Sequence, residues 1–166
     1  MKRVAVIDSS PLINLVHLEL ALKLSQFFSL VYVPRQVQVE VNKKAKFRHR
    51  LNKLYEKNLF QKCVVTEDPV RVEFSGLLDP GEAESIQQAQ ELEATHLVID
   101  EKRARKVGEA IANLRLVGTA SILARLEREG LSGSTYSLVQ KLRRDLRCRI
   151  TDQLVERAIV EASRPI

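Results

Sequence analysis

The chain has 166 residues, of which 45% are hydrophobic and 29% charged, a composition typical of a folded globular protein and not of a disordered one. The longest stretches without a charged residue span 11 residues. A membrane-spanning helix needs about 20 apolar residues, so none is expected. Two cysteines, Cys63 and Cys148, are too few for a disulfide framework or a cysteine-based zinc site. We therefore expect a single cytoplasmic domain over residues 1–166, in a reducing compartment and without a membrane anchor.

The formal net charge of +6 is concentrated in one segment. Residues 43–62 contain eight basic side chains and one acidic side chain, whereas the remainder of the chain is close to neutral. A concentrated basic segment favours a polyanionic partner. Within it Phe47, Leu51 and Leu54 recur at helical spacing, which predicts an amphipathic helix whose apolar side packs on the protein body.

Short apolar runs alternate with helical patterns along the chain. Strands are expected at 4–7, 30–33, 63–65, 97–99 and 114–117. Helices are expected at about 9–24, after Pro34, within 43–62, from Asp79, and at 102–111, 120–129, 135–144 and 151–162. This order predicts an α/β fold with a parallel sheet covered by helices on both faces.

Two of these helix predictions depend on specific residues. The alternation of Val37, Val39 and Val41 would by itself indicate a strand, but the preceding Pro34 favours a short helix. The segment 79–82 carries a capping Asp, a Pro at the first helical position and a Glu three residues after the cap. Such a capping box predicts a helix start.

Two carboxylates directly follow predicted strands. Asp8 comes after the first strand and Asp100 after the fourth. Because the carboxyl ends of parallel strands form the ligand crevice of an open α/β sheet, the two side chains can meet there. Glu82 opens a helix that leads into the fourth strand, and Glu40 follows the second. Carboxylates repel one another at neutral pH, and Mg²⁺ or Mn²⁺ is the natural cation to relieve that repulsion.

Each acid also has a purely structural interpretation, and spacing alone leaves both open. Asp8 can cap the next helix, Glu82 fits a capping box, and Glu40 can face solvent from a helix. Asp100 and Glu101 can favour the first turn of the helix that follows them. Other chemistries lack support, because the sequence has no phosphate-binding loop, dinucleotide fingerprint or nucleophile elbow. The three histidines do not have metal-ligand spacing; they are His17, His49 and His96.

Four segments resemble, in order, the acidic motifs of PIN-domain ribonucleases. They are residues 4–13, 31–40, 78–86 and 97–105, and residues 117–119 resemble a strand-to-helix junction of that family. The resemblance covers residues from about 3 to 130, so the helices expected at about 135–162 lie outside it. Within the family, the chain most resembles stand-alone prokaryotic proteins similar to the VapC-type toxins of toxin–antitoxin pairs. It implies a three-layer α/β/α fold with a central parallel sheet of about four to five strands. It also implies hydrolysis of RNA phosphodiester bonds with Mg²⁺ or Mn²⁺, a protein antitoxin and a homodimer.

The resemblance implies an acidic catalytic site of Asp8, Glu40, Glu82 and Asp100. Asp8, Glu82 and Asp100 would hold the metal directly, and Glu40 directly or through water, with Glu101 as a further ligand. The chain has Glu82 where the family usually has Asp, and Glu101 where close relatives often have a second Asp. A longer carboxylate moves a bound metal by roughly an ångström. Glu84 is an alternative to Glu82.

RNA is the expected partner of the basic residues. The predicted phosphate contacts are Lys43, Lys44, Lys46, Arg48, Arg50 and Arg103, and Phe47 or Tyr55 would stack on an unpaired base. A second basic group, formed by Arg143, Arg144, Arg147 and Arg149, is either a further contact or a solvated surface.

Two other functions stay open. One is a catalytically weak or inactive PIN-like module that binds RNA or a protein. The other is a phosphatase of the haloacid dehalogenase type, which Ser10 argues against because that family resembles D-x-D at this place.

Overall fold

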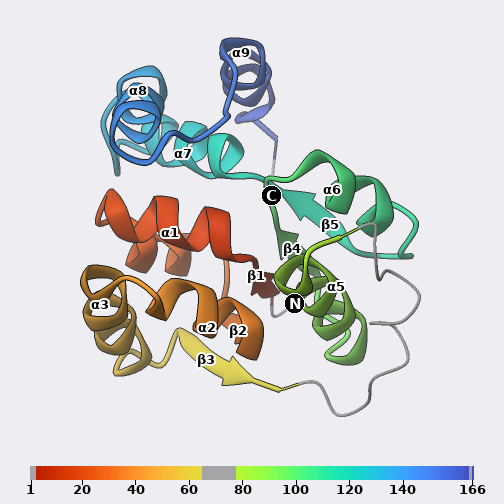
Figure 1. Cartoon of the computed structure of the whole chain (residues 1–166). Helices are drawn as coiled ribbons and strands as arrows, with labels where there is room; N and C mark the ends of the chain where they lie inside the picture. Colours follow the sequence, from red (N-terminus) through yellow and green to blue (C-terminus); the bar gives the residue numbers. More distant parts are fainter. Residues whose placement is uncertain (1–2, 65–77, 165) are drawn as a thin grey trace.

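A five-stranded parallel sheet forms the centre of the molecule. The computed structural model describes residues 3–64, 78–164 and 166. The strands are β1 (Val4–Ile7), β2 (Leu30–Pro34), β3 (Phe60–Cys63), β4 (His96–Val98) and β5 (Arg115–Val117). Their spatial order is β3-β2-β1-β4-β5, so the first strand of the chain lies in the middle of the sheet (Figure 1).

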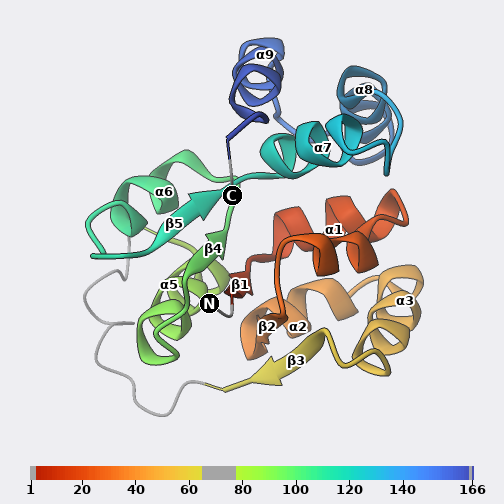
Figure 2. The same cartoon turned by 180° about the vertical axis from the view of Figure 1, so that it is seen from behind.

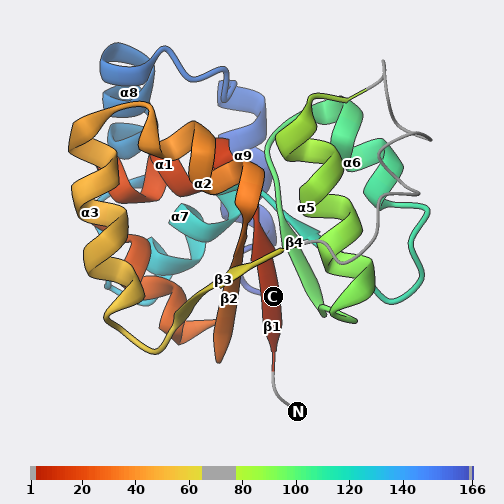
Figure 3. The same ribbon diagram turned by 60° about the horizontal axis from the view of Figure 1, so that its bottom comes forward.

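Helices cover both faces of this sheet. They are α1 (Ser9–His17), the 3₁₀ helix η1 (Ala21–Gln26), α2 (Arg35–Asn42), α3 (Ala45–Tyr55), α5 (Pro80–Glu91), α6 (Lys102–Gly108), α7 (Thr119–Arg128), α8 (Thr135–Leu146) and α9 (Asp152–Glu161). Figure 3 shows α5 and α6 on one side of the strands, with α1, α3 and α7 on the other. The predicted three-layer α/β/α fold with a parallel central sheet is confirmed. The two views in Figures 1 and 2 place α8 and α9 beyond α7, on the side of the molecule away from β3.

The two hydrophobic layers follow from the alternation of side chains along the strands. In β1, Ala5 and Ile7 belong to the larger core, which also contains Leu12 and Leu15 of α1. Val6 points to the opposite face, where it packs with residues of α5 such as Ile86. Successive side chains of a strand point to opposite faces, so a fully apolar strand supplies both layers.

Several expected elements are confirmed, and some boundaries are corrected. Residues 35–42 form a helix, and Phe47 and Leu51 are buried on the inner side of α3. The helix expected to reach Leu24 ends at His17, because Glu19 adopts a left-handed φ of 62° that interrupts it before η1. The strand expected at 63–65 spans Phe60–Cys63 instead, and Val65 lies outside the described residues.

The shift of β3 has a physical reason. It is an edge strand that pairs only with β2 among the described strands, with Phe60 opposite Val31. Phe60 is the only fully buried side chain of β3. The strand therefore has no continuous apolar run, and a search for such a run predicts it at the wrong residues. Within the described residues, no helix is both long and apolar enough to cross a membrane.

Candidate functional site

The two acids that end the central strands lie at one edge of the sheet. β1 and β4 are hydrogen-bonded neighbours, with Ile7 opposite Val98. The backbone N–H of Asp8 continues this ladder by donating to the carbonyl of Val98 at 2.9 Å. Asp100 follows two residues after Val98. Asp8 and Asp100 therefore follow neighbouring strands at the same edge of the sheet.

Asp8 is a buried carboxyl group among other acids. Its side chain is only 2% exposed, and it makes no capping hydrogen bond to α1 although Asp8 occupies the N-cap position. The hydroxyl of Ser85, on α5, donates to Asp8 Oδ1 at 3.3 Å. Burial raises the pKa of Asp8 to about 8, and the nearby carboxylates of Asp79, Glu40 and Glu82 add to that shift. These neighbours bring the first, second and third acidic motifs to one place.

Glu82 has the expected structural role and also belongs to this acidic group. Its backbone N–H donates to Asp79 Oδ1 at 2.9 Å, and its own Oε2 accepts from the Asp79 N–H at 3.1 Å. This capping box starts α5. Burial raises the pKa of Glu82 to about 7, and Asp79, Glu101 and Glu40 add like-charge repulsion. Glu82 therefore caps α5, and its carboxylate also lies close to the other acids.

Glu40 reaches the first turn of α5, where Gly81 makes room for it. A Cβ atom on Gly81 would lie 2.5 Å from Glu40 Oε1. That separation is far below van der Waals contact, so only glycine allows this approach without a shift. Any larger residue at position 81 would therefore have to displace the Glu40 carboxylate.

Gly81→Ala is expected to displace the Glu40 carboxylate and leave the helix intact. Alanine is a better helix former than glycine by up to about 1 kcal/mol, which offsets part of the steric cost. Because Glu40 contributes to the raised pKa of Asp8, moving it away is expected to lower that pKa. The carboxyl pKa values are measurable by NMR titration, with Gly133→Ala as control because a Cβ atom on Gly133 would meet open space. An unchanged pKa of Asp8 in Gly81→Ala contradicts this contact.

Glu84, the alternative to Glu82, has a different role. It is 5% exposed, and its Oε2 accepts a 2.8 Å hydrogen bond from the backbone N–H of Gln36. That N–H is one of the unpaired donors in the first turn of α2. Glu84 therefore joins α5 to α2, and Glu82 is the acid of this helix that faces the pocket.

Asp100 is held by a polar cluster. Its Oδ1 accepts from the Thr119 N–H at 2.7 Å, and its Oδ2 accepts from the Thr119 hydroxyl at 2.6 Å. The amide of Asn14 donates to Asp100 Oδ2 and to Thr119 Oγ1, both at 3.3 Å. Burial raises the pKa of Asp100, while the bonds from Thr119, the nearby Arg105 and the bond from Asn14 oppose that shift.

Asn14 is a site residue that the sequence motifs did not identify. It is 5% exposed and lies among the apolar residues that α1 buries. A buried amide in an apolar stripe requires hydrogen-bond partners, and this was the available signal in the sequence. Its partners are Asp100 and Thr119, so α1 supports the acid of the fourth motif.

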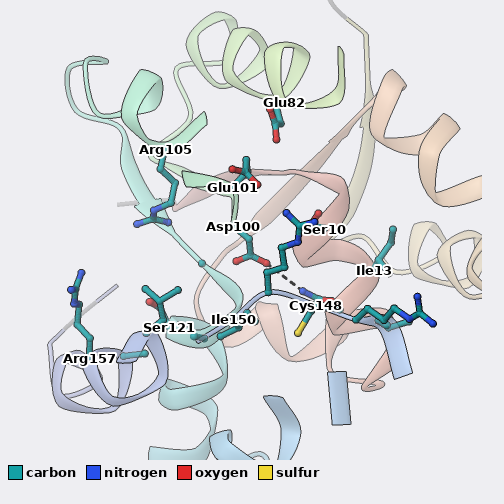
Figure 4. Close-up of a pocket in the computed structure, with 18 of the residues that line it drawn as sticks. Ser10, Ile13, Glu82, Asp100, Glu101, Arg105, Ser121, Cys148, Ile150 and Arg157 are labelled. Carbon is teal, nitrogen blue, oxygen red and sulfur yellow. Dashed lines mark hydrogen bonds between the residues drawn. The ribbon is translucent and has the colours of Figure 1, made fainter. Parts of the chain in front are cut away.

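A pocket of about 740 Å³ opens over this region (Figure 4). Its acidic lining consists of Asp79, Glu82, Asp100, Glu101, Glu109 and Glu161. Its basic lining consists of Lys44, Arg105, Arg147, Arg149 and Arg157. In the close-up, Asp100 and Glu101 lie near the centre, with Glu82 beyond them. Asp8 is too buried to line the pocket.

The donor set suits a hard divalent cation in chemical type. The available ligands are carboxylate oxygens, the donors that Mg²⁺ and Mn²⁺ prefer. The side-chain charges that shift the pKa of Asp8 are all negative, so a cation at this place relieves an existing repulsion. Across residues 3–64, 78–164 and 166, no three Asp, Glu, His or Cys side chains are placed to hold one ion together. Glu82 Oε2 and both carboxylate oxygens of Asp100 are instead hydrogen-bonded to the protein.

Most of the basic segment lies outside the pocket lining. Among the described residues predicted to bind RNA, Lys44 alone lines the pocket. Arg50 is engaged elsewhere, because its guanidinium donates to the Val16 carbonyl and to Glu19, both at 3.1 Å. The other predicted contacts are exposed outside the pocket lining; they are Lys43, Lys46, Arg48 and Arg103.

The predicted aromatic stacking on a base is wrong for Phe47. It is 3% exposed because it belongs to the core side of α3. Tyr55 is half-buried and packs against the same core, and the Lys62 amine lies 4.8 Å from the centre of its ring. Neither ring lines the pocket.

A comparison with protein-family models gives a match over nearly the whole chain. The family DUF3368, described as a PIN domain, matches residues 4–164. That range includes all four acidic motifs and both C-terminal helices, α8 and α9. Comparisons with curated proteins and with solved structures gave no match.

Proposed function

This chain belongs to the PIN-domain family, and on that premise we propose that it is a metal-dependent endoribonuclease that hydrolyses RNA phosphodiester bonds. PIN domains are generally nucleases and generally use divalent metals. The observation that carries the proposal is the burial of Asp8 beside Glu40 and Glu82, which raises its pKa to about 8. A strongly shifted carboxyl group next to an open pocket is typical of functional sites.

The residues of the proposed site divide into ligands and supports. Asp8, Glu82 and Asp100 would hold Mg²⁺ or Mn²⁺, with Glu40 acting directly or through water and Glu101 as a further ligand. When bound, the ion supplies an activated water and offsets negative charge on the phosphate oxygens. Thr119 and Asn14 fix the orientation of the Asp100 carboxylate.

Asp100→Asn is expected to reduce RNA cleavage by at least about a hundredfold, because the change removes one ligand charge from the site. The assay is cleavage of an RNA oligonucleotide in Mn²⁺, compared with the same reaction in EDTA. Glu129→Gln is the matched control, since Glu129 is exposed after the end of α7 and does not line the pocket. Equal activity of Asp100→Asn and Glu129→Gln contradicts the assignment.

A second function is a catalytically weak or inactive PIN-like module that binds RNA or a protein. One observation that favours it is the capping bond in which Glu82 Oε2 accepts from the Asp79 N–H at 3.1 Å, because this oxygen is then already bonded. Another is that no three potential metal ligands lie together among the described residues. Calorimetric titration with Mn²⁺ separates the two functions. Saturable binding that Asp8→Asn abolishes supports the nuclease, and no binding supports the inactive module.

We extend the proposal to the toxin of a toxin–antitoxin pair, acting as a homodimer in the cytoplasm and formed as one domain over residues 1–166. The support is the resemblance of the four motifs and the presence of two free cysteines, Cys63 and Cys148. Coexpression with the product of an adjacent gene is the direct test. Relief of growth inhibition by that product is the expected result.

A further inference from the structure

We propose that the RNA backbone enters the acidic site along an arginine wall formed by Arg105, Arg147, Arg149 and Arg157, and not along the basic helix α3. All four residues line the pocket that contains Asp100 and Glu82. The inference rests on the proposed function and adds to it the surface that holds the phosphates. It also assigns a role to the C-terminal helices, which lie outside the four acidic motifs.

The end of α8 directs two of these arginines into the pocket. Arg147 adopts a left-handed conformation with φ 55°, which ends the helix and turns the chain. The next residues then run along the pocket, so that 147–150 all line it. Arg143 holds this segment in place by donating from Nε to the Ile150 carbonyl at 2.7 Å and by pairing with Asp152 at 2.8 Å.

The second basic group of the sequence therefore separates into two pairs. Arg143 is occupied by Ile150 and Asp152, and Arg144 pairs with Asp145 at 2.9 Å. Arg147 and Arg149 are exposed and line the pocket. Arg143 therefore holds the turn, whereas Arg147 and Arg149 are left to face the pocket.

The other two arginines come from helices that flank the same pocket. Arg157 lies on α9, whose Val155 and Ala158 are buried and so fix the orientation of the helix. Arg105 lies on α6 and donates to the Ile99 carbonyl at 3.0 Å, next to Asp100. Figure 4 shows Arg105 and Arg157 on one side of the pocket, with Ser10 and Ile13 on the other.

These side chains are available for a ligand. In the described part of the chain, the guanidinium groups of Arg147, Arg149 and Arg157 take part in no hydrogen bond or ion pair with another residue. A guanidinium group presents a planar fork of donors that matches two phosphate oxygens. Glu109 and Glu161 also line the pocket, so recognition depends on the placement of the arginines and not on net charge alone.

The basic helix does not offer the same arrangement. Its Arg50 is bonded to Val16 and Glu19, and Phe47 is buried on its inner side. Only Lys44, at its N-cap, is part of the described pocket lining. The other basic residues of α3 do not belong to this lining.

The test compares two variants that each remove three charges. One carries Arg147→Gln, Arg149→Gln and Arg157→Gln, and the control carries Lys43→Gln, Lys46→Gln and Arg48→Gln. Binding of a single-stranded RNA oligonucleotide is measured by fluorescence anisotropy in EDTA, so the result does not depend on cleavage. We expect the Kd to rise about tenfold or more for the arginine variant and less than about threefold for the control. The slope of log Kd against log salt should fall by about 2 for the arginine variant only.

The outcomes separate this inference from the proposed nuclease activity. If the control variant weakens RNA binding as much as the arginine variant or more, the arginine wall is not the RNA-binding surface. The same conclusion follows if the wild-type protein binds no RNA at low salt. Tighter binding of the matching DNA oligonucleotide overturns RNA as its ligand. If the protein binds RNA through the arginines but does not cleave it in Mn²⁺, the proposed nuclease activity is wrong and the proposed RNA-binding role of the arginine wall stands. If circular dichroism shows that the triple variant is unfolded, Arg157→Gln alone is measured, with an expected weakening of about threefold.

Discussion

Asp8→Asn is expected to stabilise the metal-free protein and to abolish RNA cleavage. Burial raises the pKa of Asp8 from 3.8 to about 8, so at pH 7 the folded state must bind a proton that the unfolded chain has released. Each pKa unit of difference between the folded and unfolded states corresponds to about 1.36 kcal/mol. At pH 7 the raised pKa of Asp8 therefore lowers the free energy of unfolding by at most about 4 kcal/mol. Asparagine has nearly the same shape without the charge and removes that cost. It also removes a ligand charge from the proposed site.

The pH dependence gives this prediction a definite sign. Between about pH 4 and about pH 8 the folded state binds more protons than the unfolded state, so the free energy of unfolding falls as the pH rises. In Asp8→Asn this fall is expected to be smaller, with a residual slope from Glu82, whose pKa is also raised. Thermal or urea unfolding in EDTA, from about two pH units below neutrality to about one above, measures both slopes.

Asp145→Asn is the matched control for the stability measurement. Asp145 is an exposed acid that accepts from His17 at 2.9 Å and from Arg144, and its pKa is lowered by these bonds. Its removal is expected to leave the melting temperature unchanged or lower it, whereas Asp8→Asn raises it at neutral pH. Mn²⁺ should raise the melting temperature of the wild type and not that of Asp8→Asn, because a ligand stabilises the state that binds it. A lower melting temperature for Asp8→Asn in EDTA contradicts the electrostatic argument.

The sequence was sufficient to place Asp8 and Asp100 just after strands and Glu82 in the first turn of a helix, because these placements depend on local patterns. Apolar runs that end in Asp8 or lead to Asp100 predict strands, and neighbouring parallel strands end at the same edge. The start of α5 at 79–82 was equally predictable, because a capping box is built from residues only three positions apart. These features depend on a few adjacent residues and on one topological rule.

The sequence was not sufficient to show which charged residues face the pocket. Arg143 and Arg147 are both basic and lie four residues apart, yet one is bonded to Ile150 and the other lines the pocket. The difference depends on the left-handed turn at Arg147 and on the packing of α9, which are tertiary features. The density of charge along the chain instead indicates residues 43–62, whose basic side chains mostly lie outside the pocket.

Thr119→Val is expected to destabilise the protein and to impair the site through Asp100. Thr119 is fully buried, and its hydroxyl donates to Asp100 Oδ2 at 2.6 Å while it accepts from Asn14. Valine removes this bond, leaving the Asn14 amide and a buried carboxylate with fewer partners. Loss of a hydrogen bond to a charged group costs about 1.5–3 kcal/mol of stability. Loss of such support for a metal ligand costs about 10- to 100-fold in metal affinity or activity.

Thr119→Ser distinguishes the hydroxyl from the volume of the side chain. Serine keeps the bond to Asp100 and to Asn14, and both variants keep the backbone N–H that donates to Asp100 Oδ1 at 2.7 Å. We expect Thr119→Ser to retain most of the Mn²⁺ affinity and Thr119→Val to lose most of it, measured by calorimetry at a temperature where both are folded. If the two variants lose affinity equally, packing at residue 119 and not its hydroxyl supports Asp100. The difference between them thus measures how far one buried hydroxyl orients the acid that follows the fourth strand.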